Sequence, residues 1–217
     1  MNIALFGASG NIGGQIAQEA LARGHKVTAI ARDPGTHDLA PGISGNAALR
    51  TVKGDILNPA DVALAASGHD AVVSAYGPGA EGNPQTIPEA ARSLLAGLPR
   101  AGVKRLLVVG GAGSLEAAPG VALLDTPDFP EAWKPVAMAH ADALVMLQGN
   151  LDLDWTFLSP AASAGAGERT GQYRTGDDQL VTDAEGQSRI SYADLAVAVL
   201  DELEKPKFIR RRFTVGY

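Results

Sequence analysis

The stretch that decides the fold lies near the start of the 217-residue chain and reads Gly7-Ala8-Ser9-Gly10-Asn11-Ile12-Gly13. Residues 2–6 before it are mostly apolar and predict a strand, whereas residues 11–23 have the apolar spacing of a helix. Three glycines therefore fall in a turn between a strand and a helix. Gly7 is expected to permit the tight turn, Gly10 to leave the backbone open to a ligand, and Gly13 to let the helix pack closely on the sheet.

The rest of the chain alternates short apolar runs with helical patterns. Further strands are expected at residues 26–31, 51–53, 70–75, 104–109 and 155–158, and helices after Asn58 and at 87–100, 131–148 and 192–204. This alternation predicts a doubly wound Rossmann-type α/β fold, a mostly parallel sheet with helices on both faces. One domain over residues 1–217 is expected, in which about 160–190 form a small C-terminal elaboration on the substrate side.

Several local predictions concern the ends and edges of these elements. Asn58 and Ser191 are expected to cap helices, and Thr86 and Glu89 have the spacing of a capping box. Short β pieces are expected near 172–174 and 180–182. Residues 208–215 alternate basic and apolar side chains and predict a final edge strand. Its basic cluster Arg210, Arg211 and Arg212 would then discourage pairing with another sheet.

Composition excludes several classes of function. The net charge of −6 disfavours broad binding to nucleic acid, and the absence of cysteine excludes disulfides and thiolate catalysis. The four histidines lack metal-site spacing, so no metal is expected. The N-terminus does not have the pattern of a signal peptide, and no apolar run is long enough for a membrane helix. We therefore expect a cytoplasmic protein, monomeric or homodimeric, with a small-molecule partner and no contact with membranes.

The glycine turn predicts a dinucleotide site. Free amides from Ser9 to Ile12, helped by the helix dipole, would hold a diphosphate. Arg32 ends the second strand, where its guanidinium would pair with a 2′-phosphate and favour NADPH, while the adjacent Asp33 keeps NADH possible. Tyr76 and Gly77 end the fourth strand and are expected to line the cofactor, the alternative being a plain structural turn.

The same string resembles the glycine loop of extended and atypical short-chain dehydrogenase/reductases. The second half of the chain narrows the resemblance. Residues 153–160, 167–174, 188–196 and 212–217 together look like the bacterial NADH-flavin reductase subgroup of that superfamily, which is related to biliverdin IX-beta reductase and NmrA-like proteins. The resemblance covers essentially the whole chain.

This resemblance implies roles for particular residues. Asp55 matches a position that contacts adenine, although a turn aspartate is an equal alternative. The nicotinamide would lie between two loops, one from Gly110 and Gly111 to Ser114 and the other at Ser159 and Pro160. Ser114 matches an active-site serine, with a loop serine as the alternative.

The remaining candidates lie around the expected substrate pocket. His140 is a candidate proton relay, with a structural histidine as the alternative. Phe129, Trp133 and Tyr173 could stack on a flavin ring and Arg169 could meet its phosphate; core packing and a salt bridge are the alternatives.

Most short-chain dehydrogenases use a Tyr-x-x-x-Lys pair as the proton donor, and this chain lacks one. The residues four after Tyr76, Tyr173 and Tyr192 are alanine, aspartate and alanine, and Tyr217 is the last residue. The resemblance and this absence predict an NAD(P)H-dependent reductase that transfers hydride to a flavin or quinone-like acceptor, with flavin as a substrate. The alternative is a non-catalytic, NADP(H)-sensing protein of NmrA-like type; the missing tyrosine disfavours a third class, sugar-nucleotide isomerases and epimerases.

Overall fold

The computed structural model describes residues 1–34, 43, 45–79 and 82–217. Its centre is an eight-stranded sheet in which every neighbouring pair is parallel except one, the antiparallel pair at the edge. Across the sheet the strands are β10 (Arg174–Gly176), β12 (Arg211–Gly216), β8 (Asp154–Ser159), β5 (Arg105–Val109), β4 (Ala71–Ser74), β1 (Asn2–Phe6), β2 (Lys26–Ala31) and β3 (Leu49–Lys53).

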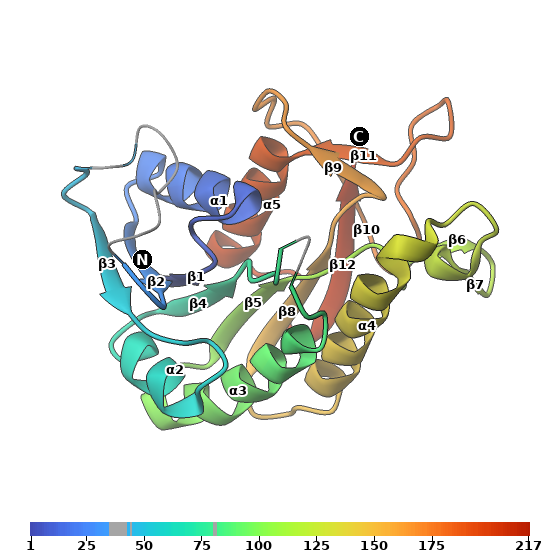
Figure 1. The fold of residues 1–217 in the computed structure, drawn as a ribbon. Coiled ribbons are helices and arrows are strands. Elements are labelled where there is room, and N and C mark those ends of the chain that lie inside the picture. The colour runs from blue at the N-terminus through green and yellow to red at the C-terminus, as the bar shows by residue number, and fades with distance from the viewer. Residues whose placement is uncertain (35–42, 44, 80–81) are drawn as a thin grey trace.

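Helices cover both faces of this sheet, which confirms the doubly wound prediction (Figure 1). One face carries α1 (Asn11–Ala22) and α5 (Tyr192–Glu204), and the other carries α2 (Pro59–Ala66), α3 (Thr86–Ala101) and α4 (Lys134–Gln148). Successive strand residues point to opposite faces, so each face has its own core. Leu5 packs in the core under α1 and α5, and Phe6 packs in the core under the other three helices.

The strand order reverses at β1. This strand pairs with β2 on one side and with β4 on the other, so the chain segments that follow β1 and β4 diverge at the carboxyl edge of the sheet. Doubly wound sheets bind ligands in the crevice at such a point. The glycine turn follows β1, and residues 75–77 follow β4.

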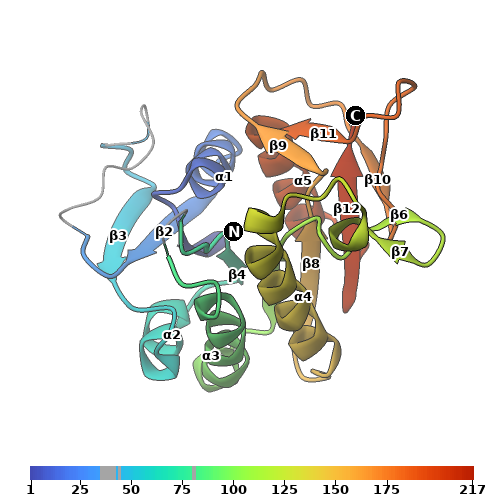
Figure 2. The same cartoon turned by 45° about the vertical axis from the view of Figure 1, so that its right-hand side comes forward.

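Shorter elements lie beside β8 and β12, at the end of the sheet formed by the later part of the chain (Figure 2). A hairpin of β6 (Glu116–Ala118) and β7 (Val121–Ala122) precedes two 3₁₀ turns, η1 (Leu123–Asp125) and η2 (Glu131–Trp133). Within residues 160–190, β10 joins the edge of the main sheet, whereas β9 (Ser163–Gly165) pairs with β11 (Arg189–Ser191). None of the helices in the described ranges is long and apolar enough to cross a membrane.

Two of the three predicted helix starts are confirmed. The side chains of Asn58 and Ser191 accept hydrogen bonds from first-turn amides of α2 and α5. The capping box predicted for α3 is wrong, because the N-cap residue is Gln85 and its side chain makes no capping hydrogen bond. The Thr86 hydroxyl instead donates to the carbonyl oxygen of Asn83 at 2.7 Å.

The predicted edge strand is also wrong. β12 lies inside the sheet between β8 and β10, because β10 adds antiparallel to the last residues of β12. Residues 180–182 do not form a strand. The three arginines do not lie along a free edge where they could discourage pairing with another sheet. They form ion pairs instead: Arg211 with Asp177, Arg212 with Asp178, and Arg210 with Asp154.

Candidate dinucleotide-binding site

A cleft opens at the point where the strand order reverses. Its walls come from the ends of β1, β2 and β4 and from the segment after β3. The predicted cofactor residues that the structure brings together there are Gly7, Ser9, Gly10, Arg32, Asp55, Tyr76 and Gly77. Residues far apart in the sequence thus converge on one cleft, as the dinucleotide prediction requires.

The three glycines of the turn differ in what surrounds them. A Cβ on Gly7, whose φ is +82°, would lie 2.5 Å from the carbonyl oxygen of Ala75. A Cβ on Gly13 would lie 2.0 Å from the carbonyl oxygen of Gly7. A Cβ on Gly10 would meet no atom closer than 3.4 Å, and Gly10 is exposed. The protein's own packing requires glycine at positions 7 and 13, whereas the space over Gly10 is available to a ligand.

The start of α1 is suited to bind an anion. Its N-cap, Gly10, has no side chain to satisfy the first-turn amides, and no acidic residue lies in that turn. The helices α2 and α5 differ, since they have the capping side chains of Asn58 and Ser191 and the first-turn acids Asp61 and Asp194. First-turn amides have no acceptor within their own helix, and the helix dipole favours negative charge there. A diphosphate is the complementary group.

Two further residues flank the cleft on the β2–β3 side. The Arg32 side chain is exposed and makes no hydrogen bond or ion pair with another described residue. Asp55 is held in place by its loop: its amide donates to Asp61 at 3.0 Å, and its Oδ1 accepts from the Leu57 amide at 2.9 Å. The lining of the cleft therefore includes an exposed guanidinium and a carboxylate that is held in place by its own loop.

The glycine loop after β5 packs tightly on the protein. A Cβ on Gly110 would lie 2.0 Å from the Phe157 ring, and one on Gly111 would lie 3.0 Å from the ring of His140 on α4. Close packing explains these two glycines without a cofactor. Their predicted contact with the nicotinamide stays a prediction.

His140 and Ser114 lie along this loop, but their surroundings differ. The Nδ1 of His140 is buried and has no hydrogen-bond partner among the described residues, and burial lowers the pKa of His140 to about 4. The imidazole is therefore neutral near pH 7 and holds no proton to donate as a cation. The Ser114 hydroxyl accepts a hydrogen bond from Arg212 at 2.9 Å.

A buried hydroxyl pair lies near the carboxyl ends of β8 and β12. Ser159 and Thr214 are opposite one another on the two parallel strands, and both are fully buried. Their side-chain oxygens have no hydrogen-bond partner among the described residues. Pro160 follows directly and is also buried. The predicted contact of Ser159 and Pro160 with the nicotinamide stays a prediction.

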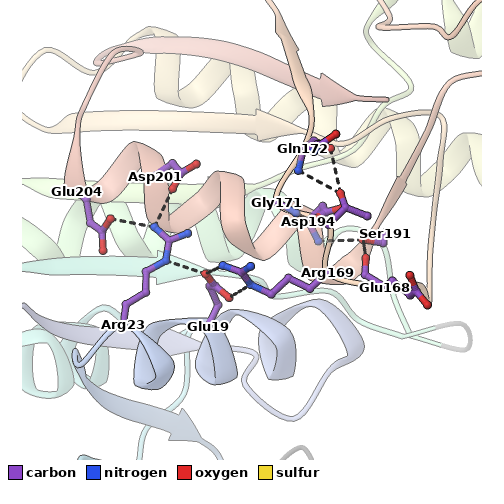
Figure 3. Close-up of polar contacts among 11 residues, drawn as sticks. Glu19, Arg23, Glu168, Arg169, Gly171, Gln172, Ser191, Asp194, Asp201 and Glu204 are labelled. Carbon is purple, nitrogen blue, oxygen red and sulfur yellow. Dashed lines mark hydrogen bonds and ion pairs between the residues drawn. The ribbon is translucent and has the colours of Figure 1, made fainter.

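The predicted substrate residues do not join the cleft. Arg169 makes a bidentate ion pair with Glu19 on α1, at 2.7 and 2.8 Å, and Glu19 also binds Arg23 (Figure 3). Tyr173 donates to Asp201 at 2.6 Å. Both side chains are engaged with α1 and α5, and the salt bridge given as the alternative for Arg169 is present. The predicted flavin contacts of Arg169 and Tyr173 stay predictions.

The aromatic candidates also lie elsewhere. The Trp133 side chain is 62% exposed on η2, and Phe129 is half-buried in the preceding loop. Neither residue lines the cleft in the described part of the chain.

The loop that carries Arg169 also contacts an acidic residue that was not among the predicted site residues. Asp194 is fully buried and accepts from the Thr170 hydroxyl, the Gly171 amide and the Tyr217 hydroxyl. Burial opposes its ionisation, but these hydrogen bonds outweigh burial and lower its pKa. Asp194 thus fastens the loop at residues 167–173 to α5 (Figure 3).

The sequence analysis also did not predict the contact of Arg212 with Ser114 or the pairing of Thr214 with Ser159. Phe213 and Val215 face the core under α1 and α5, so Arg212 and Thr214 point to the opposite face, on which Phe157 lies and Arg212 contacts Ser114. The alternation of basic and apolar residues noted over residues 208–215 was the available signal. It was interpreted as an edge strand, and its inward polar side chains were not considered.

Comparison with known proteins agrees with this geometry. Residues 7–206 match the family model described as NAD(P)H-binding. The protein named "Uncharacterized protein YwnB" of Bacillus subtilis (strain 168) is 44% identical over 223 residues, 99% of this chain and 98% of that protein.

Solved structures show the same fold. A protein of Burkholderia pseudomallei named as a candidate exported protein is 48% identical, with a TM-score of 0.90 and full coverage of both chains. SP1627 of Streptococcus pneumoniae TIGR4, named as a candidate NADH-flavin reductase, is 38% identical with a TM-score of 0.82, over 100% of this chain and 99% of that one. A short-chain dehydrogenase/reductase of Veillonella parvula DSM 2008, solved in complex with NADP, is 18% identical with a TM-score of 0.77 over 100% and 94% of the chains, and shares the fold.

Proposed function

Because the chain belongs to the NAD(P)H-binding family, we propose that it is a reductase that takes hydride from NADPH and passes it to a flavin or quinone-like acceptor. Binding of NAD(P)H is the family property. The preference for NADPH, the acceptor class and the residue roles below are our proposals.

The environment of Gly10 is the main observation in support of dinucleotide binding. At Gly7 and Gly13 a side chain would clash with the protein's own backbone. Over Gly10, by contrast, no atom of the described residues fills the space that a side chain would occupy. That space lies at the uncapped start of α1 and at the point where the strand order reverses. We assign the diphosphate of the dinucleotide to it, held by the first-turn amides.

The ribose end of the cofactor would then lie toward β2 and β3. Arg32 offers a guanidinium with no ion pair among the described residues, which suits a 2′-phosphate. A carboxylate of the protein in that place would repel such a phosphate. We assign adenine recognition to the neighbourhood of Asp55, whose position is fixed by Leu57 and Asp61.

The nicotinamide supplies hydride when the cofactor is bound, so the protein's part is to orient the acceptor, stabilise developing charge and exclude water. The chain has no Tyr-x-x-x-Lys pair, and Tyr173 is engaged with Asp201. Acceptors that take their proton from solvent, such as quinones and flavins, are compatible with a protein that lacks this proton-donating pair. We propose Ser114 as the hydroxyl that hydrogen-bonds the acceptor. His140, neutral near pH 7, could relay a proton only after first taking one up.

The test is oxidation of NADPH by the purified protein, followed at its absorbance, with FMN, FAD and a soluble quinone as separate acceptors. The proposal predicts acceptor-dependent turnover that is faster with NADPH than with NADH. Tight NADPH binding without turnover on any acceptor would overturn the enzyme proposal and favour the dinucleotide-sensing alternative.

A further inference from the structure

One largely buried cation contacts the Ser114 hydroxyl directly. The Arg212 side chain is only 10% exposed, and its Nη1 donates to both the carbonyl oxygen and the hydroxyl oxygen of Ser114, at 3.0 and 2.9 Å. Its Nε and Nη2 bind Asp178 at 2.8 and 2.6 Å. The guanidinium is therefore held on one side and presents a fixed donor to Ser114 on the other.

Arg212 reaches Ser114 across a neighbouring strand. Arg212 pairs with Phe157 of β8, and Phe157 pairs with Val108 of β5. Ser114 lies in the turn that follows β5, just beyond the glycines that pack on Phe157 and His140. The contact therefore joins the interior strand β12 to the loop that we expect beside the nicotinamide.

The chemistry of this contact determines what Ser114 can do. A guanidinium has only donors, whereas a serine hydroxyl has one donor and two acceptor sites. The Ser114 oxygen accepts from Arg212, so the hydroxyl hydrogen must point to another acceptor. A hydrogen bond from a cation also draws electron density from the oxygen and makes the remaining O–H a stronger donor.

We propose that Arg212 is a positioning residue that holds Ser114 as a hydrogen-bond donor to a carbonyl oxygen of the acceptor. This inference rests on the proposed function and narrows its substrate class to acceptors whose carbonyl is conjugated with the atom that receives hydride, such as quinones. NADPH is oxidised to NADP⁺, and the acceptor gains the hydride with its electron pair. Negative charge then accumulates on the conjugated carbonyl oxygen, which the Ser114 hydroxyl stabilises, and the proton that completes the product comes from solvent.

A purely structural role for Arg212 makes a different prediction, because its bond to the Ser114 carbonyl also fastens the loop. A double-mutant cycle separates the two roles. The variants are Arg212→Lys, Ser114→Ala and the pair, and each is measured for kcat and KM with a soluble quinone, NADPH affinity by calorimetry, and Tm. The matched control is Arg211→Lys, which changes the neighbouring arginine of the same strand, whose ion pair with Asp177 is exposed.

The proposal predicts that Arg212→Lys lowers kcat about tenfold, with KM, NADPH affinity and Tm little changed, since one donor to a developing oxyanion has effects of this order or larger. In the Ser114→Ala background the same change should alter kcat less than about twofold, and Arg211→Lys should be silent. An equal loss of kcat with and without the Ser114 hydroxyl would overturn the inference and leave the reductase proposal standing. If the wild-type protein binds NADPH but reduces no acceptor, both the inference about Arg212 and the reductase proposal are overturned. Should Arg212→Lys fail to fold, Asp178→Asn, which loosens Arg212 from its exposed side, takes its place in the cycle with the same criteria.

Discussion

Gly13 lies so close to Gly7 that a Cβ on Gly13 would stand 2.0 Å from the Gly7 carbonyl oxygen. This contact separates the glycines of the turn into two kinds. Gly7 and Gly13 let the strand, the turn and α1 meet, and they would be needed in a protein that bound nothing. The packing of the protein does not require glycine at position 10. A substitution there can therefore test ligand binding separately from stability.

The first prediction concerns this packing. Gly13→Ala should lower the free energy of unfolding by about 3 kcal/mol or more, because the clash is with backbone that has no rotamer to change. Chemical denaturation measures it. Gly77→Ala is the control: its Cβ would meet nothing within 4 Å, and a change under about 0.5 kcal/mol is expected. Equal stability of the Gly13 variant and the wild type would contradict the packing assignment.

The second prediction concerns the choice of cofactor. Arg32→Ala should weaken NADPH binding about tenfold, equivalent to about 1.4 kcal/mol, and change NADH binding less than about twofold. Titration calorimetry with both nucleotides measures the difference. Arg92→Ala removes an exposed arginine from α3 and should leave both affinities unchanged. The same loss for NADPH and NADH on changing Arg32 would refute its pairing with a 2′-phosphate.

The third prediction concerns pH. The pKa of His140 is lowered from its ordinary value of 6.5 to about 4 in the folded protein by burial, so the unfolded chain takes up the proton first as pH falls. The contribution of His140 to stability is complete above pH 6.5 and is lost as pH falls toward 4, by roughly 3 kcal/mol at most. His140→Leu should flatten the loss of stability over this interval, as followed by urea denaturation at several pH values. An unchanged pH dependence would show that His140 is not buried in its neutral form.

The fourth prediction concerns the contact between α1 and the loop that carries Arg169. Glu19 is 7% exposed, and its pKa is lowered by the hydrogen bonds and charges of Arg169 and Arg23, against the effect of burial. Glu19→Gln should cost about 1–3 kcal/mol of stability and leave NADPH affinity unchanged, because Arg169 lies outside the cleft. Glu131→Gln, in an exposed pair with Lys134, should cost less than about 0.5 kcal/mol. A large loss of NADPH affinity in Glu19→Gln would contradict the placement of Arg169.

Local patterns made the first half of the site predictable. The strand, the glycine turn and α1 are adjacent in the sequence, and the caps Asn58 and Ser191 act within their own first turns. Arg32 and Gly77 could be placed because the carboxyl ends of parallel strands share one edge of the sheet. These inferences need no knowledge of distant contacts.

The unpredicted features depend on partners far away in the sequence. Arg212 meets Ser114 across 98 positions, and Arg169 meets Glu19 across 150. The edge position assigned to β12 was wrong because β10 pairs with it from a polar segment whose own pattern is weak. Periodicity shows which way a side chain points, but only the assembled sheet determines what stands opposite it.

The central claim is that the backbone at the start of α1 holds the diphosphate of a nicotinamide dinucleotide over Gly10. The most direct test is titration calorimetry of NADPH into the wild-type protein and into Gly10→Ala, with Tm measured for both. The account predicts saturable binding by the wild type, and at least about tenfold weaker binding by the variant at an unchanged Tm, because the added methyl group occupies ligand space only. Binding by Gly10→Ala as tight as that of the wild type, or no saturable heat from the wild type with either NADPH or NADH, would contradict it.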